Sequence, residues 1–118
     1  MPAADRDELA RLQAVLAGVL RARDPAVALA AARAAADADP RLAAVDEDGL
    51  RIAALLVAKL RFQRLLSASA EAAVWFERDG RGFTEAFRDY HTSVPAESLD
   101  PWGEAAAFAR WCAESRDE

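Results

Sequence analysis

Residues 46–66, DEDGLRIAALLVAKLRFQRLL, contain the longest strongly apolar segment of the chain and decide its fold. Three acidic residues open this segment, and negative charge is favourable at the start of a helix. Aliphatic and aromatic residues then cover most of the helical circumference, so the charged residues leave only narrow polar strips. A helix that is apolar nearly all round is usually buried by neighbours on several sides. We therefore expect a central helix over about 47–66, with the other helices packed around it.

Proline and glycine divide the rest of the chain into helical segments. Aspartate is followed by proline at 24–25, 39–40 and 100–101, which is typical of an N-cap and the first helical residue. These signals and the spacing of apolar residues predict helices over about 5–23, 25–37, 41–45, 83–92 and 101–114. Residues 79–82, DGRG, predict a break, and residues 96–99 a loop. Ser67 or Ser69 either begins a further helix or lies within a continued long helix, and the sequence leaves both open.

The pattern as a whole predicts an all-α protein. No stretch of useful length shows the alternation of apolar and polar residues that indicates a strand. A chain of 118 residues has the usual size of one domain, and two smaller pieces would hold poor cores. We expect a compact single-domain bundle of five to six helices over residues 1–118.

Composition argues against several classes of function. The net charge of −5 works against nonspecific binding of nucleic acid, which needs positive charge to displace counterions. The apolar run 52–58 is too short to span a bilayer, and residues 1–8 lack the features of a signal peptide. The single cysteine excludes an internal disulfide, so we expect a cytoplasmic protein. The excess of alanine, and of arginine over lysine, is typical of a GC-rich bacterial genome.

Every aromatic residue lies at or after Phe62, so the second half of the chain supplies all the rings. Aromatic residues at helical spacing most often fill a core, but they also line grooves for ligands or partner helices. Tryptophan is enriched at the centres of protein interfaces. The candidate ligand-binding or partner-binding residues are Trp75, Phe76, Phe83, Phe87, Tyr90, His91, Trp102 and Trp111.

Residues suited to catalysis are scarce. His91 is the only histidine and could act as a general base with Asp89, although a histidine near a helix end also serves as a cap. Cys112 could act as a nucleophile, although its spacing also suits a core position. One histidine and one cysteine are too few for a common zinc site, and we expect no metal and no cofactor.

Three hypotheses for the function follow. The favoured one is a non-catalytic, acidic protein-interaction or regulatory module, whose partner is a basic protein or a second copy of the chain in a homodimer. The alternative is a small helical binder of an apolar or aromatic ligand, with a pocket among Trp75, Phe76, Phe83, Phe87 and Tyr90. The third is an enzyme that uses His91 or Cys112.

Overall fold

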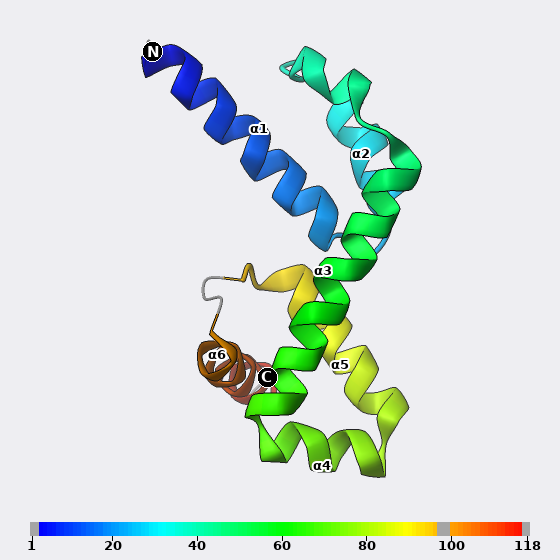
Figure 1. Ribbon diagram of the computed structural model, residues 1–118, viewed down its shortest axis with the longest axis vertical. Coiled ribbons are helices and arrows are strands. Elements are labelled where there is room, and N and C mark those ends of the chain that lie inside the picture. The colour runs from blue at the N-terminus through cyan, green and yellow to red at the C-terminus, as the bar shows by residue number, and fades with distance from the viewer. Residues whose placement is uncertain (1–2, 97–99, 117–118) are drawn as a thin grey trace. The chain divides into compact units, whose positions relative to one another are not determined.

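The computed structural model describes the backbone of residues 3–96 and 100–116, and the side chains of residues 5–96 and 100–115. Within this part of the chain it contains six α-helices, one 3-10 helix and no strand (Figure 1). The predicted all-α fold is therefore confirmed. The elements are α1 (Ala3–Arg21), α2 (Pro25–Ala34), the 3-10 helix η1 (Pro40–Ala44), α3 (Glu47–Ala68), α4 (Ala70–Arg78), α5 (Gly80–Ser93) and α6 (Pro101–Arg116). Most of the predicted loop at 96–99 lies outside the described residues.

Contacts within the chain group the residues into two compact units. Unit 1 covers residues 1–56 and holds α1, α2, η1 and the first part of α3. Unit 2 covers residues 57–118 and holds the rest of α3 with α4, α5 and α6. The division thus falls inside a continuous helix, and the single-domain interpretation of residues 1–118 stays a prediction.

All three aspartate–proline pairs begin a helix, as the sequence predicts. The side chain of Asp24 accepts a hydrogen bond from the backbone N–H of Val27, and Asp39 accepts one from Arg41. Asp100 accepts one from the N–H of Trp102 at 2.9 Å. These bonds satisfy backbone donors that have no partner inside the helix.

The long helix is interrupted at Ser69, whose hydroxyl accepts a hydrogen bond from the N–H of Ala72 and caps α4. The next break is shorter than predicted, because Asp79 both ends α4 and caps α5. Its Oδ1 accepts a hydrogen bond from the N–H of Gly82, and a Cβ at Gly82 would collide with its Oδ2. The predicted break over 79–82 is therefore wrong for Gly80 onward, which is helical.

Unit 1 has a small aliphatic core. Its buried residues come from four different elements: Val19, Leu29, Leu42 and Leu50. Arg33 of α2 reaches across to η1 and donates hydrogen bonds to the carbonyl oxygens of Leu42 and Val45, at 2.9 and 2.7 Å. These bonds satisfy two carbonyl groups at the end of η1 and fix it against α2.

Unit 2 has a larger core that is mainly aromatic. Its fully or nearly buried residues are Leu65, Ala72, Phe83, Phe87, Tyr90 and Phe108. The ring of Phe108 on α6 lies 5.8 Å from that of Phe83 and 5.1 Å from that of Tyr90, both in edge-to-face geometry. Such ring pairs add to the stability gained from burial, so they hold α6 against α5.

Helix α3 departs from the prediction that neighbours bury it on several sides. Its inner face, which includes Ala54, Arg61 and Leu65, is buried. The opposite face carries four large aliphatic residues that are more than half exposed: Ile52 (60 %), Leu55 (71 %), Leu56 (55 %) and Leu60 (57 %). The prediction was wrong for this face because helical periodicity shows that both sides are apolar, but not which side has neighbours.

Candidate functional site

The rings of the predicted aromatic pocket pack against each other. Phe83, Phe87 and Tyr90 are buried, and Trp75 is half-buried. The ring of Phe83 lies 5.4 Å from that of Trp75 and 5.9 Å from that of Phe76, while Phe87 and Tyr90 are 6.4 Å apart. At these separations the rings are in contact with one another.

The other three candidate residues lie in different environments. His91 is buried and stacks on Phe87, with the ring centroids 5.7 Å apart. Trp111 is half-buried and stacks on Phe108 at 6.1 Å. Trp102, in the first turn of α6, is 70 % exposed and is the most accessible ring among the described residues.

A buried polar cluster, defined here as Arg61, Tyr90, His91 and Glu104, joins α3, α5 and α6 in unit 2. Glu104 accepts a hydrogen bond from Arg61 Nε at 2.6 Å through one carboxylate oxygen, and one from the Tyr90 hydroxyl at 2.5 Å through the other. The ionic side chains of Arg61 and Glu104 are 1 % and 2 % exposed. A buried charge is tolerated only when it is paired and hydrogen-bonded, and both conditions are met here.

Arg61 contacts both residues of the cluster that belong to α5. Nη1 of Arg61 lies 3.1 Å from Nδ1 of His91, and a guanidinium can only donate, so a hydrogen bond between them needs Nδ1 as the acceptor. The guanidinium carbon also sits 4.6 Å from the centroid of the Tyr90 ring, a cation–π contact. Burial, and then the hydrogen bond to Glu104, raise the pKa of Tyr90 well above its ordinary value. Tyr90 is thus held neutral as a donor to the carboxylate.

Sequence reasoning missed Arg61 and Glu104. Arg61 looked like part of a polar strip, although it follows Ala54 and precedes Leu65 on one helical face, which was the available signal. Glu104 sits in the first turn of α6, where an acidic residue is expected for electrostatic reasons alone. The cluster joins three helices and has the character of a structural network, because its charges are sealed from solvent.

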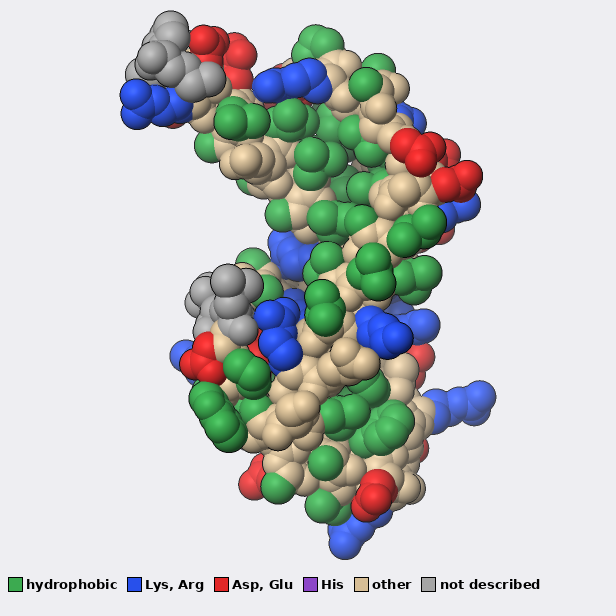
Figure 2. Space-filling view, in the orientation of Figure 1, with side chains coloured by type: hydrophobic (Ala, Val, Ile, Leu, Met, Phe, Trp, Pro, Cys, Tyr) green, Lys and Arg blue, Asp and Glu red, His purple; other side chains and the backbone are tan. Residues whose placement is uncertain are grey.

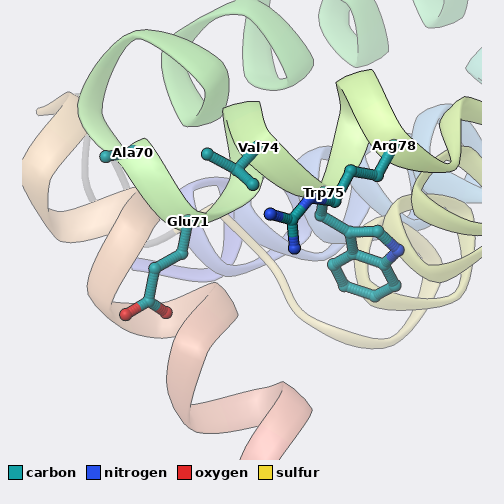
Figure 3. Close-up of a pocket in the computed structure, with 5 residues that line it drawn as sticks. All are labelled: Ala70, Glu71, Val74, Trp75 and Arg78. Atoms are coloured by element: carbon teal, nitrogen blue, oxygen red, sulfur yellow. The ribbon is translucent and has the colours of Figure 1, made fainter.

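A shallow, open hollow of about 470 Å³ lies on the surface of α4. It is lined by Ala70, Glu71, Val74, Trp75 and Arg78, all from this one helix (Figure 3). In that view the guanidinium of Arg78 lies between the side chains of Val74 and Trp75. A smaller hollow of about 220 Å³ lies between α4 and α6 and is bordered by Cys112. Neither is the deep, enclosed site that a small apolar ligand usually occupies.

Among the described residues, α3 carries more exposed large hydrophobic side chains than any other helix. We call Ile52, Leu55, Leu56 and Leu60 the α3 apolar face. Spacings of three, four and eight residues place them along one side of the helix. Each of these four side chains is exposed, so the other residues of its own unit do not cover it. Figure 2 shows apolar side chains at the surface along this part of the chain. Contiguous apolar patches of this kind mark sites of interaction.

The described residues offer little to the remaining hypotheses. They include no group of three or more His, Cys, Asp or Glu side chains placed to hold a metal ion. None of the described helices combines the length and apolar content needed to cross a membrane. Cys112 is half-buried and forms no disulfide, while His91 contacts Arg61. Catalysis by either residue stays a prediction.

Comparison with known proteins finds no family model, no curated protein and no solved structure that matches this chain.

Proposed function

We propose that the chain is a non-catalytic protein-interaction module, regulatory in its effect, that binds a helix of a protein partner through the α3 apolar face. The observation that carries the proposal is the exposure of four large aliphatic side chains on one side of a single helix. Isolated exposed leucines are normal in soluble proteins, but a row of them at helical spacing is not.

The shape of the face favours a helical partner. Residues spaced by three and four form ridges on a helix, and such ridges pack into the grooves of a second helix. Amphipathic helices are commonly recognised in this way, through anchors on successive turns. The α3 apolar face offers such anchors over more than two turns, from Ile52 to Leu60.

The energy available from the face indicates a reversible complex. Burying one aliphatic side chain completely contributes about 1.5–3 kcal/mol, so four that are half exposed contribute roughly 3–6 kcal/mol. Association costs at least about 4 kcal/mol in lost translational and rotational freedom. The apolar contact therefore only offsets that cost, and the charged residues beside the face must supply part of the affinity and the specificity.

Other parts of the proposal rest on composition. The net charge of −5 suits a partner with a basic surface, because complementary charge speeds association. A single cysteine suits a reducing compartment, which supports a cytoplasmic location. The bias toward alanine and arginine supports a bacterial source.

The competing hypothesis of a small-ligand binder has weaker support. Its predicted pocket residues contact one another, and the hollow beside Trp75 is open and shallow. The interaction hypothesis needs only the surface that α3 already presents.

The test compares a charge placed on the face with the same charge placed elsewhere. Leu56→Glu inserts a carboxylate into the α3 apolar face, and Val27→Glu places the same charge on α2, at an aliphatic residue that is also more than half exposed (64 %). Tagged wild-type and variant chains are purified from the native host, and stoichiometric protein partners, including a second copy, are measured by native mass spectrometry. We expect a partner with the wild type and Val27→Glu, and loss of it with Leu56→Glu. Equal association of all three chains, or of none, would refute the proposal.

A further inference from the structure

The charges that flank the α3 apolar face are arranged asymmetrically. Asp48 lies at the beginning of the helix and Lys59 eleven residues later, and both are exposed. Ile52 and Leu55 lie between them. The positions 48, 52, 55 and 59 are separated by four, three and four residues, which is the spacing of core positions in a coiled coil. One side of α3 therefore carries, in order along the helix, an acidic residue, two apolar residues and a basic residue.

This order is self-complementary only when two copies run in opposite directions. In an antiparallel pair with a two-fold axis between residues 53 and 54, Asp48 faces Lys59 of the second copy, and Ile52 faces Leu55 of the second copy. The two-fold symmetry repeats each contact. The interface therefore has two layers in which Ile52 faces Leu55, and an ion pair between Asp48 and Lys59 at each end. In a parallel pair, Asp48 would face Asp48 and Lys59 would face Lys59, and like charges that face each other repel.

We propose that the partner of the α3 apolar face is a second copy of this chain, bound with its α3 antiparallel in this register. This inference rests on the proposed function and names its partner. Leu56 borders the two apolar layers and is covered by the same contact. The interface is isologous, as in most homodimers, because the same residues are used on both sides.

The size of the contact predicts a weak dimer. Three helical turns per copy bury less surface than the roughly 1,200 Å² at which stable interfaces begin. The net charge of −5 on each copy also opposes association, although screening at physiological salt limits this repulsion to a range of about 8 Å. Dimerisation should therefore depend on protein concentration, and the local pairing of Asp48 with Lys59 should decide its orientation.

Disulfide cross-linking tests the register. Two chains are prepared in a Cys112→Ser background, one with Ile52→Cys and the other with Leu55→Cys, and are mixed and oxidised. The antiparallel register predicts mainly cross-links between the two different chains. A Val27→Cys chain, with its thiol on α2, is the control for random collision. Predominant cross-links between identical chains, or cross-linking no faster than the control, would overturn the proposal.

Charge reversal tests the ion pairs. Lys59→Asp alone turns two attractions into two repulsions, and we expect the dissociation constant from sedimentation equilibrium to rise about tenfold or more. Adding Asp48→Lys restores the pairing in the antiparallel arrangement only, so the double variant should return to within about threefold of the wild type. Circular dichroism establishes that both variants keep their helices, and failure of the folded double variant to recover would count against the proposal.

The oligomeric state separates failure of this inference from failure of the proposed function. A wild type that stays monomeric at all concentrations, yet loses a different protein partner on Leu56→Glu, overturns the dimer and leaves the interaction module standing. A wild type that stays monomeric and binds nothing overturns both.

Discussion

The most informative perturbation of the fold is Glu104→Gln, which removes one charge from the buried polar cluster and changes almost nothing else. The amide has the size of the carboxylate, and its oxygen and nitrogen can still form hydrogen bonds with Arg61 and Tyr90. What is lost is the negative charge that compensates Arg61, which is 1 % exposed. Nη2 of Arg61 has no hydrogen-bond partner among the described residues, and the other contacts of the guanidinium, with Nδ1 of His91 and the ring of Tyr90, supply no negative charge.

Removing one partner of a buried ion pair costs about 3–5 kcal/mol, because the remaining charge is left in a poorly solvated site. Domains of this size have a total free energy of unfolding of about 5–15 kcal/mol, so the variant should lose a large part of it. With a denaturant slope of about 2 kcal/mol per molar in urea, the unfolding midpoint should fall by about 1.5–2.5 M.

Tryptophan fluorescence is a suitable assay, because Trp75, Trp102 and Trp111 all lie in unit 2 with the cluster. The matched control is Glu85→Gln on α5. That glutamate is exposed and lies 3.9 Å from Arg88, and exposed pairs contribute less than about 1 kcal/mol. A change below about 1 kcal/mol for Glu104→Gln, or one equal to the control, would refute the view that the buried charge pair fixes unit 2.

Three further predictions concern titration and capping. The raised pKa of Tyr90 means that folding favours the neutral phenol, so the stability that Tyr90 contributes is complete below pH 10.0 and is lost at higher pH. Because Tyr90 is the only tyrosine, phenolate absorbance should appear only as unit 2 unfolds. Ionisation of Tyr90 while the tryptophan fluorescence remains native would contradict this prediction. The hydrogen bond from Arg41 lowers the pKa of Asp39 from 3.8 to about 2, so stability from this pair is present above pH 3.8 and lost as the pH falls toward 2. The melting temperature of Asp39→Asn, followed by circular dichroism, should therefore depend less on pH in that range than that of the wild type, and identical profiles would exclude the contribution. Asp79→Ala removes the cap of α5 and should cost unit 2 about 1 kcal/mol in urea unfolding, whereas an unchanged midpoint would show that the cap contributes nothing.

Local signals were sufficient to predict most of the helices. The aspartate–proline pairs at 24–25, 39–40 and 100–101 work through hydrogen bonds between residues two or three apart, so the sequence alone identifies them. The break at Ser69 was one of two alternatives, because a serine can cap a helix or remain within one. The tertiary structure selects the cap.

Long-range features could not be predicted in the same way. Arg61 and Glu104 are 43 residues apart, and nothing in the local pattern shows that they meet. The exposure of Leu55 and Leu56 was also missed, because periodicity reports that a face is apolar but not whether a neighbouring helix lies on it. In both cases the missing information is the packing of separate elements.

The binding role of α3 is tested most directly by the stability of Leu55→Glu, measured by urea unfolding with circular dichroism at a concentration where the chain is monomeric. Leu55 is 71 % exposed. If the α3 apolar face is a surface kept open for a partner, the substitution should change the free energy of unfolding by less than about 0.5 kcal/mol, as exposed substitutions usually do. A loss of about 2 kcal/mol or more would show that the folded monomer itself buries this face, and would contradict its role in binding a partner.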